Sequence, residues 1–342
     1  MYEDLKRQFL TTPRLTTAYY RTGEGNEKKL LLVHGNVSSS AVYLPFMEEF
    51  GKVYDTVALD LRCFGESSAL PVDAEKGYGE WVEDIEEFKA ALGWDKFAIA
   101  GWSMGGGVVQ QYILDHPQEL TGAVLINPAS PYGFGGTKDE DGKLLEPAGL
   151  AAGAGCVNQG LVAALADPES KQLFYDTLHG VYLSSGRTLD PEYEELLVDE
   201  MKKTKLGEGM YPGDASQCGK WPFVVAGSKG VCNTMAPQYA DMSGIINVQP
   251  KPPVLWIIGD KDIMVSDKSF AEFGTLGMTG AVPGWPGMDE VPPQPMVSQT
   301  RYVLKKYAEN GGSYKEVTMD GGHACYLEHP DEFIKIMKDF IG

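Results

Sequence analysis

Short apolar runs alternate with longer amphipathic stretches over residues 1–127 of the chain. Apolar runs of about 4–8 residues between turn residues are typical of buried strands, whereas apolar positions spaced by three and four indicate helices. The pattern predicts core strands at Leu30–Val33, Thr56–Asp60, Phe97–Ala100 and Ala123–Ile126. It predicts helices at Glu80–Phe88 and Gly107–Leu114. This alternation favours an α/β fold, with a mainly parallel twisted sheet and helices on both of its faces.

The same pattern continues at the two ends of the chain. Leu15–Tyr20 and the run before it are expected to add antiparallel edge strands. Pro253–Gly259 and Tyr314–Met319 read as two further strands, and the helical run 330–341 follows them. The sheet is therefore expected to be built from both ends of the chain.

The alternation stops between Asn127 and Pro253. This region has helix-like stretches near Val162–Tyr175 and Tyr193–Lys203, within connections rich in Gly, Pro and Ala. A structureless loop longer than about 15 residues is uncommon in a compact domain. We therefore expect residues 128–252 to form a mainly helical cap, or lid, inserted into a core of residues 1–127 and 253–342. An independent second domain is the alternative.

A second insertion, Gly274–Pro295, is rich in proline. We expect it to form an extended loop near the strand Pro253–Gly259, where it could border the functional cleft.

Composition narrows the class of partner. The chain has 342 residues, of which 43% are hydrophobic, so it can bury a large core. Its net charge of −19 argues against nucleic-acid and anionic-membrane partners, and we expect a small-molecule partner. Assembly of the chain into a homo-oligomer is left open. The residues after Met1 lack the apolar stretch of a signal peptide, and five scattered cysteines favour reduced thiols. These features predict a cytoplasmic protein with no membrane span.

A serine lies in a G-x-S-x-G pattern, in the segment Gly101-Trp102-Ser103-Met104-Gly105. A strand-like run precedes it and a helix-like run follows it. A sharp strand-to-helix turn strains the residue at its apex and exposes that side chain, and small neighbours leave room for the turn. The context favours Ser103 as a nucleophile over an incidental serine in a glycine-rich loop.

A serine nucleophile needs a base, which in this arrangement follows later in the chain. The five histidines are His34, His116, His179, His323 and His329. His323 lies on a glycine-rich loop after a predicted strand, which favours it as the base. His329 and His116 each precede a proline, which is typical of a helix start.

The orienting acid is expected after the strand Pro253–Gly259. Asp260 and Asp262 both lie there, and either one is also typical of a turn or a helix cap. Asp262 is preferred and Asp260 is the alternative. Asn127 ends the preceding core strand, but an amide cannot serve as an anionic partner.

These motifs together resemble the α/β-hydrolase superfamily over nearly the whole chain. Leu31–Asn36 resembles the family's strand and oxyanion loop, and Gly259–Asp262 resembles its G-x-x-D acid loop. Gly322-His323 with Glu328-His329-Pro330 resembles its histidine loop. The segment Ala58–Ser67 resembles its D-x-R-G-x-G-x-S loop, except that Cys63 replaces a glycine, so the local turn is expected to differ.

The resemblance implies a catalytic triad of Ser103, Asp262 and His323. It implies that the backbone N–H groups of Asn36 and Met104 form the oxyanion hole. The proposed chemistry needs only protein groups and water, so no cofactor and no metal are expected. Cys325, two residues from His323, is expected to pack near the site rather than to act as a nucleophile.

The cap is expected to select the substrate. Trp102 and Gly35 beside the nucleophile, and Trp221 and Tyr211 in the cap, are expected to line the pocket. Other cap residues that could contribute are Met201, Met210, Phe223, Met235 and Tyr239. We therefore expect hydrolysis of a carboxylic ester or lactone of a small hydrophobic or aromatic molecule through an acyl-enzyme.

Other branches of the superfamily remain as alternatives. Asn36 resembles the corresponding loop of haloalkane dehalogenases, but those enzymes use an aspartate where this chain has Ser103. A carbon–carbon bond hydrolase and a relative of the cofactor-free haloperoxidases are alternative enzymes. A ligand-sensing protein with this fold and little turnover is the alternative from a different class.

Overall fold

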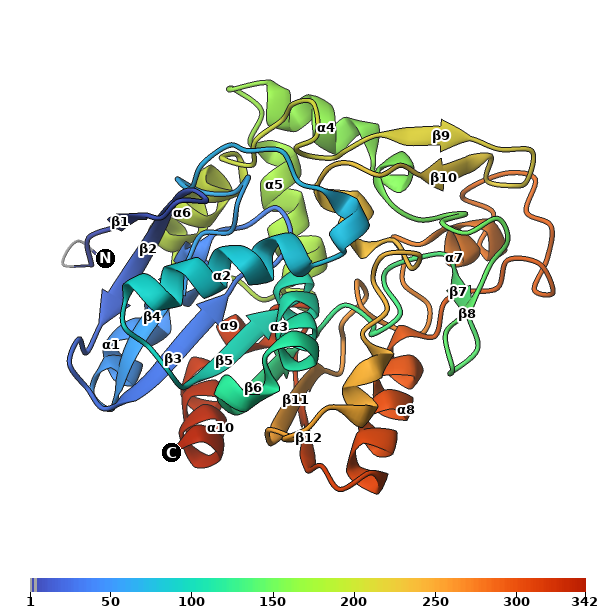
Figure 1. Cartoon of the computed structure of the whole chain (residues 1–342). Coiled ribbons are helices and arrows are strands. Elements are labelled where there is room, and N and C mark those ends of the chain that lie inside the picture. Colours follow the sequence, from blue (N-terminus) through green and yellow to red (C-terminus); the bar gives the residue numbers. More distant parts are fainter. Residues whose placement is uncertain (1, 3–4) are drawn as a thin grey trace.

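A twisted sheet forms the centre of the molecule in the computed structural model, which describes residue 2 and residues 5–342 (Figure 1). Met1, Glu3 and Asp4, which belong to the N-terminal segment considered above for a signal peptide, lie outside the described residues. Within that range the sheet has eight strands, in the order β1-β2-β4-β3-β5-β6-β11-β12. Their bounds are β1 Gln8–Thr11, β2 Thr16–Thr22, β3 Lys28–Val33, β4 Tyr54–Leu59, β5 Phe97–Trp102, β6 Leu120–Ile126, β11 Val254–Gly259 and β12 Tyr314–Met319.

The strand directions confirm the predicted fold class. The pairs from β4 to β12 are all parallel, whereas β1–β2 and β2–β4 are antiparallel. Strands β4, β5 and β11 are buried along their whole length, as expected for a parallel sheet covered on both faces. The apolar runs of the sequence therefore became the buried strands that they predicted.

Helices cover both faces of the sheet (Figure 1). Their bounds are α1 Leu44–Gly51, α2 Gly79–Ala91, α3 Met104–Asp115, α8 Met296–Glu309, α9 Cys325–Glu328 and α10 Pro330–Ile341. Helices α2 and α3 pack together in front of the sheet in Figure 1, and α1 packs against α10. Each helix turns its apolar stripe to the sheet, and the core runs through both layers as one continuous cluster.

The segment of residues 128–252, called the inserted segment below, joins β6 to β11 and lies over one end of the sheet (Figure 1). Its helices are α4 Gln159–Ala166, α5 Gln172–Thr177 and α6 Pro191–Met201, and the π-helical turn Leu178–Tyr182 follows α5. Its short strands are β7 Thr137–Lys138, β8 Lys143–Leu144, β9 Ala215–Gln217 and β10 Val224–Ala226. Asp190 caps α6 by accepting the N–H groups of Glu192 and Tyr193, as its place before Pro191 favours.

The prediction for the inserted segment was only partly right. The stretch expected near Val162–Tyr175 is divided between α4 and α5, because residues 167–171 leave the helix. The stretch expected at Tyr193–Lys203 begins two residues earlier, at its capped N-terminus. Much of the segment is loop and short hairpin, so it is less helical than the sequence indicated.

The second insertion begins with a helix rather than an extended loop. Glu272 accepts the N–H groups of Gly274 and Thr275, and this cap starts α7, Phe273–Met278. The remaining residues to Pro295 have neither helix nor strand. This insertion and the β9–β10 hairpin share a small hydrophobic cluster, centred on Leu145, Leu150, Ala151, Trp221 and Val291.

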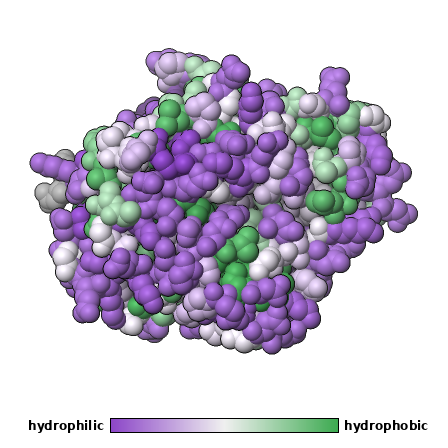
Figure 2. Space-filling model, viewed as in Figure 1, coloured by the Kyte–Doolittle hydropathy of each residue, from purple (hydrophilic) through white to green (hydrophobic). Residues whose placement is uncertain are grey.

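The face shown in Figure 2 is mostly hydrophilic, with small separated apolar spots. Large apolar residues that are exposed include Phe9, Phe223 and Met288, and they come from distant parts of the chain. None of the helices in residues 5–342 combines the length and the apolar composition that crossing a bilayer requires.

Candidate active site

The candidate residues meet where neighbouring parallel strands end. Strands β5, β6, β11 and β12 are adjacent in that order, and their carboxyl ends lie at one edge of the sheet. Ser103 follows β5, and its N–H donates to the carbonyl of Ile126 at the end of β6 (2.9 Å). Asp262 follows β11 and His323 follows β12. Ligand sites of open parallel sheets form at this edge.

The backbone at Ser103 is strained. Its φ and ψ are 58° and −120°, which is unusual for a residue with a side chain. The flanking glycines are required by close backbone contacts. A Cβ on Gly101 would lie 2.2 Å from the carbonyl oxygen of Gly105, and a Cβ on Gly105 would lie 2.4 Å from that of Val33. The G-x-S-x-G pattern is therefore the sequence that this turn needs, and the turn raises Ser103 above the sheet edge.

His323 is hydrogen-bonded to Asp262. Its Nδ1 lies 2.8 Å from Oδ2 of Asp262, and both side chains are almost fully buried. The other carboxylate oxygen, Oδ1, accepts the N–H groups of Met264 (2.7 Å) and Val265 (3.0 Å). Because a carboxylate only accepts, the bond fixes the proton on Nδ1 and leaves Nε2 of the neutral ring as an acceptor.

Asp260, the alternative acid, has a different partner. Its Oδ1 accepts the N–H of Gly321 (3.0 Å), and the residue is exposed. Asp260 thus supports the backbone of the histidine loop, whereas Asp262 is the one bonded to the imidazole. The two aspartates point to different places because the chain turns after Gly259, where Asp262 N–H donates to the Gly259 carbonyl.

Two side chains hold the histidine loop through its backbone. The carbonyl oxygen of His323 accepts the indole N–H of Trp102 (2.7 Å) and the amide N–H of Asn127 (2.8 Å). The amide oxygen of Asn127 accepts the N–H of Gly259 (2.8 Å), at the start of the acid loop. Asn127 stands at the end of β6, where the sequence excluded it as an acid, and it links the loops that carry Asp262 and His323.

Among the described residues, the side chains of Ser103 and His323 are not hydrogen-bonded to each other. Trp102, adjacent to Ser103 in the chain, lies with its ring centroid 5.2 Å from that of His323. Serine–base hydrogen bonds are often long or misaligned in unliganded enzymes and tighten when substrate binds. Trp102 thus connects the turn of Ser103 with the loop of His323, and no hydrogen bond joins the two side chains in this part of the chain.

The loop after β3 packs against the serine from the other side. A Cβ on Gly35 would lie 3.0 Å from Cβ of Ser103, so glycine allows this close approach without displacing the serine. The next residue, Asn36, is partly exposed, and its side-chain oxygen accepts the N–H of Val37. Met104 begins α3, where backbone N–H groups have no partner within the helix. The N–H groups of Asn36 and Met104 have no backbone acceptor in the described residues.

His34 stabilises this loop as a buried neutral ring. Its Nδ1 donates to the carbonyl of Gly35 (2.7 Å), and its Nε2 accepts the N–H of Leu61 (2.9 Å). Burial lowers the pKa of His34 below its usual value. Protonation at Nε2 would remove the acceptor that Leu61 needs.

We expect His34 to lower the free energy of unfolding in mild acid. Because the folded pKa of His34 is lowered, the unfolded chain takes up the proton first as the pH falls below about 6.5. The contribution of neutral His34 to the free energy of unfolding is therefore complete above that pH. It is lost, at up to ~1.4 kcal/mol per pH unit, as the pH falls toward the pKa of His34 in the folded state. Urea unfolding at several pH values from 7.5 to 5 should give a smaller decline for His34→Gln than for the parent. Equal declines would contradict this assignment.

The loop after β4 has a strained backbone at Cys63. This residue has φ +73°, the conformation for which glycine is usual, and its thiol lies 2.9 Å from the carbonyl of Leu70. Asp60 organises the loop by accepting the N–H and hydroxyl of Ser40 (2.8 and 2.5 Å) and the N–H of Glu66 (2.9 Å). Cys63 therefore adopts a conformation that favours glycine, and the strain of this turn is borne by the cysteine.

The predicted pocket residues do not all meet at the site. Trp102 is buried behind the histidine, and Tyr211 places its hydroxyl beside the side chains of Asn36 and Cys232. Trp221 instead lies in the cluster it shares with Phe273, and its indole N–H donates to the carbonyl of Pro283 (2.8 Å). Trp221 packs there because α7, which the sequence did not predict, supplies an apolar surface beside it.

The surroundings of His116, His329 and Cys325, which the sequence analysis did not assign to catalysis, are consistent with structural roles. His329 and His116 each precede a proline that opens a helical turn, as expected. Burial raises the pKa of the Cys325 thiol, whose sulfur lies 3.7 Å from the amide nitrogen of Asn127. A protonated, buried thiol is a poor nucleophile, which fits a packing role.

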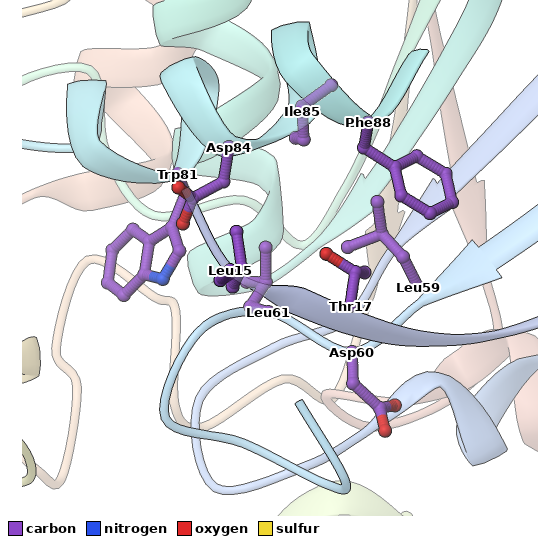
Figure 3. Close-up of a pocket in the computed structure, with 9 residues that line it drawn as sticks. All are labelled: Leu15, Thr17, Leu59, Asp60, Leu61, Trp81, Asp84, Ile85 and Phe88. Atoms are coloured by element: carbon purple, nitrogen blue, oxygen red, sulfur yellow. The ribbon is translucent and has the colours of Figure 1, made fainter. Parts of the chain in front are cut away.

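Two cavities lie away from Ser103. One, of about 10 Å³, lies between α2 and the strands below it and holds at most one water (Figure 3). It is lined by residues that include Leu15, Leu59, Trp81 and Asp84. The other, of about 200 Å³, is lined by residues of the inserted segment that include Tyr132, Thr137 and Asp241. Neither has a triad candidate in its lining.

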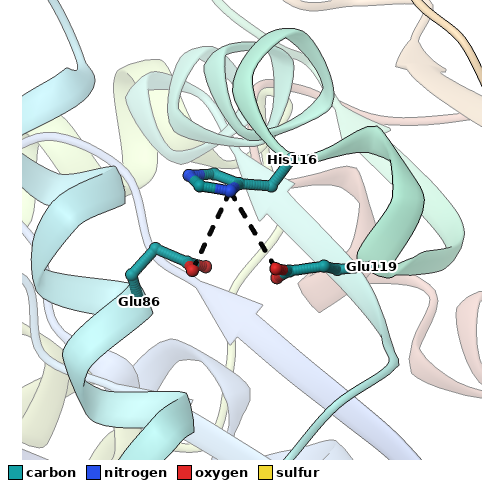
Figure 4. Close-up of side chains that lie close together, drawn as sticks. All are labelled: Glu86, His116 and Glu119. Atoms are coloured by element: carbon teal, nitrogen blue, oxygen red, sulfur yellow. Dashed lines mark ion pairs between the residues drawn. The ribbon is translucent and has the colours of Figure 1, made fainter.

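Glu86, His116 and Glu119 point toward one another at the surface (Figure 4). Such a set could ligate a metal, but Lys89 lies 2.5 Å from Glu119 and 3.6 Å from Glu86. The hydroxyl of Tyr112 lies within hydrogen-bond distance of both carboxylates and donates its single proton to one of them. The lysine already supplies the positive charge that these acids need, so the cluster reads as an ion-pair network.

Tyr182 is a site residue that the sequence analysis missed. Its ring makes an edge contact with that of Trp102, at a centroid distance of 4.9 Å, and lies 6.0 Å from the ring of His323. It stands in the inserted segment without any motif around it. No sequence signal distinguishes it from the other tyrosines of that segment.

The comparisons with known proteins agree with this architecture. A family model described as the alpha/beta hydrolase fold matches residues 28–149. The chain is 29% identical to 1-acylglycerol-3-phosphate O-acyltransferase ABHD5 of Mus musculus over 117 residues, which are 34% of this chain and 33% of that protein. The match thus spans about a third of the length of this curated relative.

Solved structures match over the whole length. Carboxylesterase CesB (YbfK) from Bacillus subtilis has a TM-score of 0.61 at 15% identity, with 99% of this chain and 95% of that chain covered. The enol-lactonase from Burkholderia xenovorans LB400 has a TM-score of 0.57 at 16% identity, with 98% and 99% covered. At these identities the likeness concerns the fold. Residues 28–149 therefore match the alpha/beta hydrolase family, and the sheet described above has the α/β-hydrolase fold over the length of the chain.

Proposed function

We propose that the protein is a serine hydrolase that cleaves a carboxylic ester or lactone of a small hydrophobic or aromatic molecule. The observation that carries the proposal is the 2.8 Å hydrogen bond between His323 Nδ1 and Asp262 Oδ2, beside a serine held at positive φ. This pair fixes the tautomer that a base needs, and the strained turn presents a hydroxyl near it.

In the first half of the reaction, Ser103 Oγ attacks the substrate carbonyl carbon while Nε2 of His323 takes the hydroxyl proton. The negative charge that develops on the carbonyl oxygen is stabilised by the N–H groups of Asn36 and Met104, where one such donor is typically worth ~3–4 kcal/mol. The N-terminus of α3 favours the same charge. The C–O bond then breaks, and the alcohol oxygen takes the proton from His323.

In the second half, water attacks the acyl carbon bound to Ser103 while His323 takes one of its protons. The serine oxygen leaves with that proton, and the carboxylic acid is released. With a lactone, the alcohol remains covalently attached to the acyl group, so the product is a single hydroxy acid. Asp262 stays ionised throughout and stabilises the imidazolium in both halves.

The surroundings of the site support an apolar substrate. Trp102, Tyr182 and Tyr211 are aromatic and buried around it, and we propose that the inserted segment acts as a substrate-selecting cap. Among the solved structures of similar fold are a carboxylesterase and an enol-lactonase. Both reactions start from an attack on an ester carbonyl, which is why the proposal names the two together.

Labelling with a fluorophosphonate probe tests the proposal directly. The probe reacts with an activated serine, so peptide mapping should find the label on Ser103 in the native protein and none after heat denaturation. Turnover of p-nitrophenyl acetate, p-nitrophenyl butyrate and a panel of aliphatic and aromatic lactones should accompany labelling.

Three results would contradict the proposal. A native protein that neither labels at Ser103 nor hydrolyses any ester or lactone would lack an activated serine. Tight binding of a small ligand from the panel without product would instead favour a sensor. Cleavage confined to carbon–carbon bonds of diketone substrates would favour a carbon–carbon hydrolase.

A further inference from the structure

The inserted segment contacts two catalytic loops at once through residues 182–184. Ala324 N–H donates to the carbonyl of Tyr182 (2.7 Å), which attaches this segment to the histidine loop beside His323. The hydroxyl of Tyr182 donates to the carbonyl of Asn36 at 3.2 Å, with a longer contact to Val37 at 3.5 Å. One residue therefore touches the loop of the base and the loop of the proposed oxyanion hole.

A buried carboxylate reinforces the contact with the histidine loop. Glu328 has a fully buried side chain, and its Oε1 accepts the N–H groups of Gly322 (2.7 Å) and Ser184 (3.0 Å). Its Oε2 accepts the hydroxyl of Ser184 at 2.5 Å. The gap between the two backbones is small, since a Cβ on Gly322 would lie 2.8 Å from the carbonyl oxygen of Tyr182. This pairing fixes where the ring and hydroxyl of Tyr182 stand.

The local backbone explains why Tyr182 points inward. It ends the π-helical turn Leu178–Tyr182, and such turns occur often at functional sites. The ring packs edge-on against Trp102 and beside His323. Burial raises the pKa of Tyr182, so its hydroxyl stays protonated and remains a donor. It has an acceptor on the core side in the carbonyl of Asn36.

We propose that Tyr182 is a positioning residue of the inserted segment, whose hydroxyl fixes the peptide of Asn36 so that the oxyanion loop is held in register with the histidine loop. The inference rests on the proposed function, because it assigns the Asn36 loop to the transition state. Tyr182 acts through the backbone of Asn36 and through the loop of His323, and it takes no proton in the reaction. The inserted segment then has a part in catalysis besides selecting the substrate.

The test compares two tyrosine-to-phenylalanine variants. Tyr182→Phe removes the hydroxyl and keeps the ring contacts with Trp102 and His323. Tyr193→Phe is the matched control, since Tyr193 is also a buried tyrosine of the inserted segment and donates to a core carbonyl, that of Ala41 (3.1 Å). Each variant loses one neutral hydrogen bond, so equal effects on stability are expected.

Tyr182→Phe should lower kcat on p-nitrophenyl butyrate by about 3- to 10-fold, which is the range for one neutral hydrogen bond. The KM should change less than about twofold, because the loop acts on the transition state rather than on substrate binding. The pH profile of kcat/KM should keep its shape, because the base is untouched. Tyr193→Phe should retain kcat within about twofold.

Three results would overturn this inference. The first is an unchanged kcat in Tyr182→Phe, and the second is an equal fall in both variants with an equal fall in Tm. The third is an effect on KM alone. A parent protein whose Ser103 resists the fluorophosphonate would overturn the proposed function together with this inference. If the parent and Tyr182→Phe were instead labelled at the same rate, only the role of Tyr182 would be overturned.

Discussion

Replacing Ser103 by alanine is expected to lower kcat for ester hydrolysis by about 10⁵- to 10⁶-fold, the loss found when a nucleophile of this class is removed. The residue stands at φ 58°, and alanine places a Cβ at the same strained position as serine. The fold and its stability should therefore change little, and the lost activity should reflect the missing hydroxyl. Hydrolysis of p-nitrophenyl butyrate and fluorophosphonate labelling measure the two effects, and circular dichroism checks the fold.

The control for this variant is Ser68, a part-buried serine that follows the loop of Asp60 and whose hydroxyl donates to the carbonyl of Thr16 (3.2 Å). Ser68→Ala should keep activity within about threefold, since it loses only two part-buried neutral hydrogen bonds, both to the backbone of Thr16 in β2. If Ser103→Ala retained the activity of the parent, another group would carry the chemistry.

The second large effect is expected at the acid. Asp262→Asn keeps an oxygen that can accept the N–H groups of Met264 and Val265, so the loop should keep its shape. The amide N–H₂ now faces Nδ1 of His323 and forces the proton onto Nε2, which is the wrong tautomer for a base. A substitution of this type lowers kcat by about 10⁴-fold. Steady-state kinetics of p-nitrophenyl butyrate hydrolysis measure it.

Asp260→Asn is the matched variant, because the two aspartates lie in the same loop and only one contacts the imidazole. An asparagine at 260 can still accept the N–H of Gly321, as Asp260 does at 3.0 Å. Its kcat should remain within about tenfold of the parent. A larger loss in Asp260→Asn than in Asp262→Asn would assign the orienting acid to Asp260.

The core of the fold could be predicted because its signals are local. Buried parallel strands are short apolar runs, and β3, β5 and β11 appear as such in the sequence. The strained turn at Ser103 could be predicted because it demands glycines at fixed positions, which the contacts of Gly101 and Gly105 explain. These are constraints that a few adjacent residues impose on one another.

The rest depended on contacts between distant residues. Asp260 and Asp262 are equivalent in the sequence, and only the turn after Gly259 directs one of them to His323. The sequence only excluded Asn127 as an anionic partner, because its side chain is an amide. In the structure this amide is hydrogen-bonded to the loops that carry His323 and Asp262. These assignments need the packing of four strand ends at one edge of the sheet, which no local pattern encodes.

The two insertions were the hardest parts to predict. Helix α7 arises from a cap at Glu272, just before the proline-rich second insertion, and it packs beside Trp221 in a separate cluster. Tyr182 owes its position to a π-helical turn and to backbone pairing with the histidine loop. The sequence does not distinguish aromatic residues that pack beside the candidate site from those that pack in the cluster of Trp221, because both positions are buried and apolar.

The backbone pairing of residues 182–184 has a consequence for protein engineering. In a chimera that carried a foreign lid on this scaffold, the graft would replace the acceptor of Ala324 N–H and the partners of Glu328 together with the specificity pocket. A graft that leaves Tyr182–Ser184 of the host in place would exchange the residues around the ligand. It would also keep the backbone contacts that hold the histidine loop.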